Sequence, residues 1–180
     1  LSRMNVMPYP KPQGKKTLIK SVVLPKKKKK AVKREPKLDP DQWFSLCVRE
    51  RAGWNCQACG KHYEPWESTK GLPANPGLHC SHYVGRANYA TRFDPLNVDA
   101  HCYGCHAKFE GNPHIFMLWK SEQLGTMYDM LIEKSNNIML GKTARKEKQE
   151  IAKHYKAEFE KMQALRSKGV LGRINFQGYL

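Results

Sequence analysis

Apolar positions between residues 39 and 53 repeat with the spacing of a helix. Asp39 or Asp41 can cap a helix that runs to about Ala52, with an apolar side made of Trp43, Phe44, Leu46, Cys47 and Val48. Gly53 follows directly and favours an end at that point. We therefore expect one amphipathic helix here.

A helical period returns after Pro113. Gly125 predicts a break between two helices, whose apolar faces hold Ile115, Leu118 and Trp119, and then Leu124, Met127, Tyr128, Leu131 and Ile132. Thr143 is expected to begin a third helix, with a stripe at spacings of four and three formed by Ile151, Tyr155, Phe159, Met162 and Leu165. Packing within the chain accounts for these faces. The last stripe is also a candidate interface for a homodimer.

The segment between these helical regions is less regular. Residues 61–77 are rich in Pro and Gly and predict a loop. The short apolar run "LHCSHYV", bounded by Gly77 and Gly85, predicts a strand. Residues 86–102 read as another loop, with a turn at Asp94-Pro95, and a short helix is expected from Cys102 to near Gly111.

Charge divides the chain unevenly. Of 32 basic residues, 13 lie in residues 1–37, against the single acid Glu35. Residues 1–40, which also hold the run Lys26, Lys27, Lys28, Lys29 and Lys30, cannot form a core and are expected to be a disordered basic arm that binds phosphate. A solubilising tail or a localisation signal is the alternative. No run of about 18 apolar residues predicts a membrane span.

Two cysteine pairs have the spacing of a zinc site. Cys56 and Cys59, and Cys102 and Cys105, are each separated by two residues, which lets both thiolates of a pair face one ion across a tight turn. Two such pairs complete a tetrahedron and predict structural zinc. Of the remaining thiols, Cys47 is expected to be buried, and Cys80 to face the core from the strand.

Four histidines lie close to these cysteines in the sequence. His79 and His82 sit on the predicted strand, and His106 directly follows the last cysteine at the start of a helix. Asn97 lies between them, so that the order is His, Asn, His on strand, loop and helix. His101, like His62, is expected to lie on the surface.

This order resembles the HNH, or ββα-metal, nucleases in their zinc-bearing variety, of which the phage endonuclease VII is one. More closely, residues from about Trp43 to Leu165 resemble the NinG (Rap) recombination proteins of lambda-like phages. The stretches that carry this resemblance are "CQACG", "HCSHY", "FDPLNVDAHCYGCH", "EGN", "LGTMYDMLIE" and "IAKHYKAEFEKM".

The resemblance implies an α+β fold, with a small zinc-braced ββα-metal core over residues 41–112 and flanking helices over 113–168. A C-terminal tail over 169–180 and the basic arm over 1–40, which the resemblance does not cover, complete the expected organisation. It implies a structure-specific endonuclease that hydrolyses branched recombination intermediates such as Holliday junctions and D-loops. Phage recombination proteins would be natural partners, and the cytoplasm of the bacterial host the location.

Carried over by position, His82 matches the general base, Asn97 the central asparagine and His106 a ligand of the catalytic Mg²⁺ or Mn²⁺. Ser81 stands where common HNH motifs have a second ligand, so His79 is the expected second ligand here. Because imidazole is softer than carboxylate, this choice also admits other transition ions.

The expected chemistry is attack of an activated water on a phosphodiester. A neutral imidazole can take a proton from water near pH 7, and the side-chain carbonyl of Asn97 would aim the His82 ring. Arg86, Arg92 and Lys108 are candidate phosphate contacts, and Tyr83, Tyr89 and Phe93 could stack on unpaired bases. Two alternatives remain: a noncatalytic zinc-braced DNA-binding recombination protein, and an HNH endonuclease directed by sequence.

Overall fold

The computed structural model describes residues 38–68 and 71–179. The basic arm, with Lys26–Lys30, lies outside the described residues except for its last positions. Pro36–Leu180 form one compact unit. The segments 41–112 and 113–168, expected as a core and an extension, therefore belong to the same packed body.

Helix α1 spans Pro40–Arg51 and matches the expected helix. The Asp39 side chain caps it by accepting a hydrogen bond from the Asp41 backbone N–H at 3.0 Å, and Pro40 occupies the first turn, where its missing N–H costs nothing. The chain leaves the helix through Gly53 at a φ of +56°. Phe44, Cys47 and Val48 are buried in the core.

Two antiparallel strands form a hairpin at the centre of the molecule. Strand β3 spans Leu78–His82 and confirms the expected strand, and β4 spans Val98–Cys102, with His79 opposite His101 and Ser81 opposite Asp99. A second, smaller pair, β1 (Trp66–Glu67) and β2 (Pro73–Ala74), lies within the predicted loop.

The loop predicted over residues 86–102 is wrong for its last five residues. All five residues of β4 are buried, including Asp99 and His101. The sequence Val98–Cys102 does alternate apolar and polar residues, but it is short and directly follows the turn at Asp94-Pro95. Its polar residues Asp99 and His101 face the interior, because helices cover both faces of the strand.

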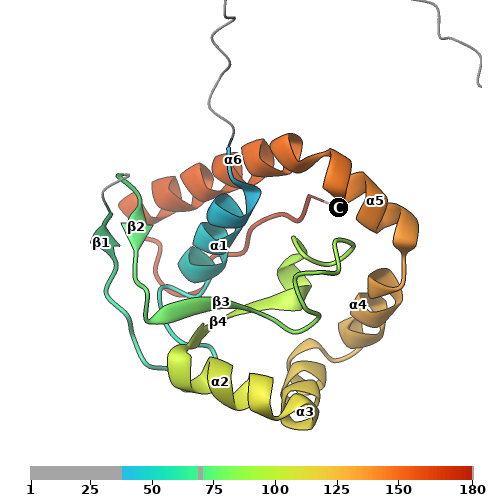
Figure 1. Ribbon diagram of the computed structural model, residues 1–180. Helices are drawn as coiled ribbons and strands as arrows, with labels where there is room; N and C mark the ends of the chain where they lie inside the picture. The colour runs from blue at the N-terminus through green and yellow to red at the C-terminus, as the bar shows by residue number, and fades with distance from the viewer. Residues whose placement is uncertain (1–37, 69–70, 180) are drawn as a thin grey trace, which may run out of the picture. The chain divides into compact units, whose positions relative to one another are not determined.

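Helices cover both faces of this hairpin. Helix α2 (Tyr103–Gly111) contacts β3 and β4 from one side, and α1 contacts the same strands from the other (Figure 1). Helix α3 (Pro113–Leu124) follows α2, and α4 (Met127–Ser135) follows the break at Gly125, whose φ is +54°. The predicted α2 and the break at Gly125 are confirmed.

The third predicted helix begins elsewhere. Helix α5 spans Ile138–Lys146 and contains Thr143, while α6 starts afresh at Lys148 and runs to Ser167. The cap of α5 is Asn137, whose side chain accepts from the Leu140 N–H at 3.0 Å. A side-chain cap six residues upstream of Thr143 thus sets the start.

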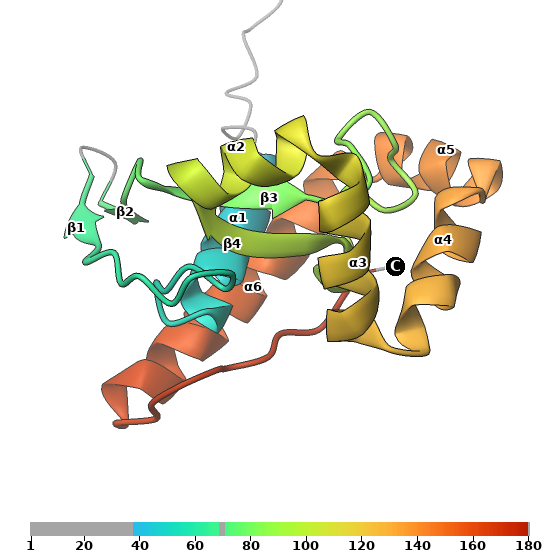
Figure 2. The ribbon, with the colours of Figure 1, turned by 90° about the horizontal axis from the view of Figure 1, so that it is seen from below.

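The stripe on α6 packs inside the chain. Ile151, Tyr155, Phe159 and Met162 are buried, and α6 lies along α1 on the side away from the hairpin (Figure 2). The prediction of this stripe as a dimer interface is therefore wrong. Only Leu165, at 40% exposure, remains open to solvent.

The end of the chain adds to the same core. Ile174 is buried, and the Phe176 ring lies 6.1 Å from the Phe44 ring, between centroids. No helix in the described part of the chain has the length and apolar character that a membrane crossing requires.

Candidate functional site

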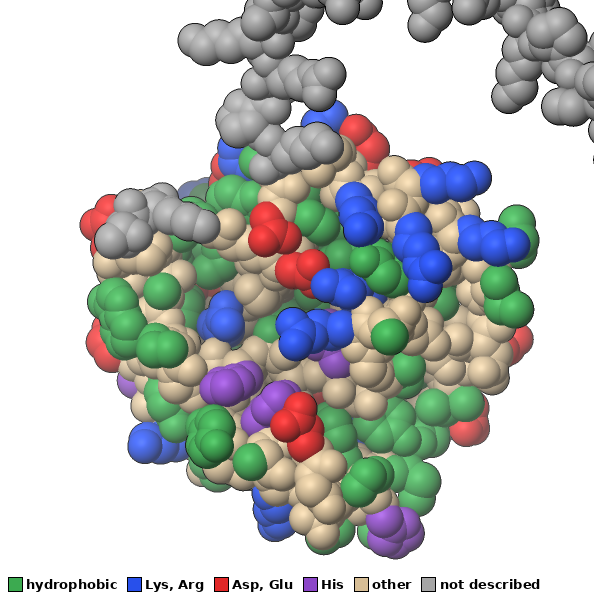
Figure 3. Space-filling view, viewed as in Figure 1, with side chains coloured by type: hydrophobic (Ala, Val, Ile, Leu, Met, Phe, Trp, Pro, Cys, Tyr) green, Lys and Arg blue, Asp and Glu red, His purple; other side chains and the backbone are tan. Residues whose placement is uncertain are grey.

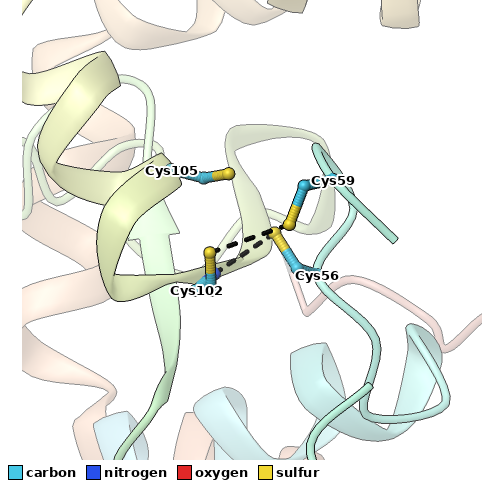
Figure 4. Close-up of side chains that lie close together, drawn as sticks. All are labelled: Cys56, Cys59, Cys102 and Cys105. Atoms are coloured by element: carbon cyan, nitrogen blue, oxygen red, sulfur yellow. Dashed lines mark hydrogen bonds between the residues drawn. The ribbon is translucent and has the colours of Figure 1, made fainter. Parts of the chain in front are cut away.

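The four predicted zinc ligands come together at one end of the hairpin. Cys56 and Cys59 lie on the turn after α1, where the Gly60 N–H donates to the Cys56 carbonyl at 2.8 Å, and Cys102 and Cys105 lie at the start of α2. The four sulfur atoms lie within 4.8 Å of one another and point into a common centre (Figure 4).

The geometry of this cluster fits a tetrahedral ion. The Cys59 and Cys102 sulfurs are 3.8 Å apart, and Zn–S bonds of about 2.3 Å set tetrahedral sulfurs about 3.8 Å apart. The Cys102 N–H donates to the Cys56 sulfur at 3.2 Å. Burial raises the pKa of Cys102, but hydrogen bonds from Cys105 and the other thiols outweigh it and lower that pKa to about 6. The cluster could hold a metal such as zinc.

The cluster also fastens the first cysteine pair to the hairpin. The Gln57 N–H donates to the Ala100 carbonyl, and the Ala100 N–H donates to the Gln57 side chain, at 2.8 and 2.9 Å. An ion held here would join the end of α1, β4 and α2. The two other cysteines stand apart: Cys47 is buried as expected, and burial raises the pKa of the half-buried Cys80 to about 12.

A cavity of about 490 Å³ brings together the histidines of the predicted catalytic site. His79, Cys80 and His82 line it from β3, so Cys80 lies at a cavity wall. His106 and Glu110 line it from α2, and Figure 3 shows His side chains at the edge of this hollow.

His79 and His106 lie next to each other on one side of the cavity. Their ring centroids are 5.2 Å apart, and the His106 Nε2 lies 3.5 Å from a carboxylate oxygen of Glu110. Burial, then the neighbouring His106 and Arg49, lowers the pKa of His79, which keeps its nitrogen available to a cation. Within residues 38–68 and 71–179, however, only the four cysteines form a closed group of three or more ligands.

His82 is aimed by a backbone carbonyl. Its Nε2 lies 3.0 Å from the Arg92 oxygen. Since a carbonyl only accepts, Nε2 carries the proton and the lone pair lies on Nδ1. Burial, with a smaller contribution from the charges of Arg86 and Arg92, lowers the pKa of His82 to about 4, against the raising effect of the carbonyl. The ring is therefore neutral near pH 7.

The contact predicted between Asn97 and His82 is wrong. The fully buried Asn97 side chain accepts from the Val84 N–H at 2.7 Å and donates to the carbonyls of Val84 and Thr91 at 2.9 Å each. These bonds hold both ends of the 83–97 loop together. Asn97 thus shapes the loop that carries the Arg92 carbonyl to His82.

The predicted DNA-contacting cations have different environments. Arg86 is exposed and lines the cavity. The Arg92 guanidinium donates to both carboxylate oxygens of Asp41, at 2.9 and 2.7 Å, and is half-buried in this ion pair. Lys108 is exposed but does not line the cavity, because two residues after His106 a side chain points to another side of α2. Phe93 is buried in the core, so it is not a stacking surface for bases.

The expectation that His101 lies on the surface is wrong. It is fully buried, with its ring 5.0 Å from both Phe109 and Trp119, and neither ring nitrogen has a hydrogen-bond partner among the described residues. His62 is exposed, as expected, and contacts Asn55 and Glu64.

The sequence matches no described protein family and no curated protein, and the structure matches no solved structure. Function is therefore argued from the two sites themselves.

Glu110 and Arg49 are two of the cavity residues that were not predicted from the sequence. Glu110 lies one helical turn after His106, a spacing of four that puts both side chains on one face of α2. Arg49 lines the cavity from α1, and its Nε donates to the Leu78 carbonyl at 2.8 Å. The spacing could have indicated Glu110, whereas nothing in the sequence near Arg49 links it to β3.

Proposed function

We propose that this protein is a metal-dependent DNA endonuclease that hydrolyses phosphodiester bonds in branched DNA. The observation that carries the proposal is a neutral, aimed imidazole, His82, in one cavity with the His79–His106 pair. This is the arrangement that a general base next to an ion-binding site requires.

A divalent ion would be held by His79 and His106, with Glu110 as an oxygen donor. The nearness of the two imidazoles and the carboxylate supports this donor set, and the oxygen ligand suits Mg²⁺ or Mn²⁺ better than a purely nitrogen site would. A bound ion would neutralise charge on the scissile phosphate and on the leaving oxygen.

The chain's own groups have separate tasks in this reaction. His82 takes a proton from the attacking water at Nδ1, while the Arg92 carbonyl keeps the ring in place through Nε2. Arg86, exposed at the cavity wall, binds the phosphate. Attack on phosphorus with departure of the 3′ oxygen gives 5′-phosphate and 3′-hydroxyl ends.

The preference for branched over linear DNA rests on the resemblance to the NinG proteins. Action within a bacterial host, a homodimer on a two-fold junction, and recombination proteins as partners belong to the same proposal. If a homodimer forms, its interface must use a surface other than the α6 stripe, which α1 covers.

The test is cleavage of a labelled four-way junction, a D-loop and a linear duplex by zinc-loaded protein, without added ion and with Mg²⁺ or Mn²⁺. His82→Ala should reduce cleavage at least about 100-fold, the usual contribution of a general base, and leave DNA affinity unchanged. His62→Ala, which removes an exposed imidazole that does not line the cavity, is the matched control.

Each outcome decides between the candidate functions. Ion-dependent cuts near the branch that His82→Ala removes support the proposal. Equal rates on a linear duplex with one recognised site indicate a sequence-directed nuclease. Tight binding without cleavage in either ion refutes catalysis and leaves a zinc-braced DNA-binding protein.

A further inference from the structure

Three cations surround one aromatic ring beside the cavity. Tyr89 lies on the 83–97 loop, and its ring centroid is 5.0 Å from the Arg92 guanidinium carbon, 4.8 Å from that of Arg145 and 5.2 Å from the Lys148 ammonium nitrogen. Arg145 comes from the last turn of α5 and Lys148 from the first turn of α6. Loop and helices thus converge on this ring.

Two of the three charges have no acidic partner. Arg92 is paired with Asp41. Arg145 and Lys148 are exposed, and neither forms an ion pair within the described part of the chain. Glu147, which lies between them in sequence, accepts a hydrogen bond from the Tyr179 hydroxyl at 3.1 Å. The positive end of the 20-residue α6 lies at the same place, next to the negative end of the shorter α5, so the potential here comes mainly from the side-chain charges.

This arrangement has a cost in the absence of a ligand. Like charges gathered around one ring repel each other, and cation–π contacts at an exposed site compensate this repulsion only weakly. An anion placed between Arg145 and Lys148 would remove the repulsion. Phosphate is the anion that guanidinium and ammonium groups together suit best.

The ring is held in place before any ligand binds. The Asn88 side chain donates to the Ser135 carbonyl at 2.8 Å, which ties the loop to the end of α4. Gly141 of α5 lies against the loop so closely that a Cβ there would be 3.4 Å from the Ala90 nitrogen. A fixed platform loses little entropy on binding.

Arg92 connects this platform to the catalytic cavity. Its carbonyl contacts His82, its side chain contacts Tyr89 and Asp41, and it also donates to the Arg86 carbonyl at 2.9 Å. Asp41 and Arg86 line the cavity. Figure 3 shows Lys and Arg side chains gathered between the hollow and the region of α5.

We infer that Tyr89, Arg145 and Lys148 form a second phosphate-binding site, the Tyr89 platform, which holds the DNA backbone next to the cleavage cavity. The identity of the ligand as DNA rests on the proposed function. The platform itself binds phosphates without regard to sequence and sets the side of the cavity, toward α5 and α6, on which flanking DNA lies.

The test is the salt dependence of DNA binding by Arg145→Gln/Lys148→Gln. Zinc-loaded protein without Mg²⁺ or Mn²⁺ is titrated into fluorescent four-way junction over a salt series. Loss of two phosphate contacts should make the slope of log K against log salt shallower by about 1.8 and weaken binding about thirtyfold at 0.15 M salt. Circular dichroism verifies that the variant folds.

A matched variant removes the same charge elsewhere. Lys168 and Arg173 are exposed and lie at and beyond the other end of α6, so Lys168→Gln/Arg173→Gln should change the slope much less. Equal losses in the two double variants would attribute the effect to net charge and overturn the platform. An unchanged slope in Arg145→Gln/Lys148→Gln would overturn it as well.

Cleavage by the same proteins, assayed after Mg²⁺ or Mn²⁺ is added, separates the platform from the proposed nuclease. Loss of affinity in Arg145→Gln/Lys148→Gln together with an inactive wild type would support the platform and refute the nuclease. A wild type that cleaves DNA, with an Arg145→Gln/Lys148→Gln variant that binds DNA as tightly as the Lys168→Gln/Arg173→Gln variant, would support the nuclease and refute the platform. If the platform and the nuclease are both correct, Arg145→Gln/Lys148→Gln should raise KM and leave kcat within about twofold of the wild-type value. A wild type that binds no DNA overturns both.

Discussion

His101 should make the protein sensitive to acid, and His101→Leu should remove part of that sensitivity. The ring is fully buried between aromatic side chains, and burial lowers its pKa to about 4, with Lys120 and His106 lowering it further against the effect of Asp99. In the unfolded chain, a histidine titrates near 6.5. Between these values the unfolded state binds more protons than the folded state, so stability is complete above about pH 6.5 and falls as the pH decreases toward 4.

The size of the effect follows from the two pKa values. At pH 5, a group with a pKa of 6.5 in the unfolded chain and about 4 in the folded chain destabilises the fold by about 2 kcal/mol relative to pH 7.5. His82, with a pKa of about 4 as well, contributes a similar loss. Leucine has about the volume of histidine and cannot be protonated, so His101→Leu should remove one of these two contributions.

The assay is urea unfolding of wild type and His101→Leu at pH 7.5 and pH 5.0 with excess zinc. The loss of stability between the two pH values should be about 2 kcal/mol smaller in the variant. Protonation of the zinc thiolates weakens both proteins alike and cancels in the comparison. His62→Leu, at an exposed site, should keep the wild-type pH dependence.

A second readout comes from stability at pH 7.5. Neither ring nitrogen of His101 has a hydrogen-bond partner among the described residues. Replacing an unsatisfied buried group with an apolar one is neutral or stabilising, so His101→Leu should not lower stability at this pH. An equal pH dependence in variant and wild type would refute the argument, because it would mean that the buried ring is not held neutral.

Two further predictions concern the parts that hold the sites together. Zinc-loaded wild type should contain one zinc per chain by atomic absorption. Cys105→Ser should lose the zinc and melt at a lower temperature, whereas Cys80→Ser should keep the zinc. Zinc retained by Cys105→Ser would contradict the four-cysteine assignment. Lys120→Met should cost about 3 kcal/mol in urea unfolding, because it removes the ammonium 2.6 Å from the buried Asp99 and leaves that carboxylate with Arg51 at 4.0 Å as its remaining cation and the Gln123 amide as a neutral donor. Asp99→Leu added to Lys120→Met should recover part of this loss, and no recovery would refute the explanation.

Structural features were predicted correctly where they depend on residues that lie close together in the sequence. The cap at Asp39, the glycine break at Gly125 and the two Cys-x2-Cys pairs each depend on a few neighbouring residues, and all three features appear in the structure. His79, His82 and His106 also share one cavity. Residue types at short spacings in the sequence therefore predict where these helices and turns begin and end, and which side chains come together there.

Where prediction failed, the determinant was burial that the sequence does not reveal. Strand β4 carries Asp99 and His101, two residue types that read as surface, yet Arg51 and Lys120 approach Asp99, and aromatic rings enclose His101. The partners come from α1 and α3, far from β4 along the chain. A polar residue in the core can be recognised only once its partners are in place.

Asn97 illustrates the same limit for function. The sequence order suggests a direct contact with His82, but the two side chains meet different backbone groups: Asn97 binds Val84 and Thr91, and His82 binds the Arg92 carbonyl. The loop thus connects the buried Asn97 amide to the Arg92 carbonyl, which orients the His82 ring. Because the same loop also presents Tyr89 to Arg145 and Lys148, one buried asparagine side chain holds the loop that carries both the Arg92 carbonyl next to His82 and the Tyr89 ring. Loosening this loop should therefore impair hydrolysis and DNA binding together, whereas changes at His82 or at Arg145 should affect one of them.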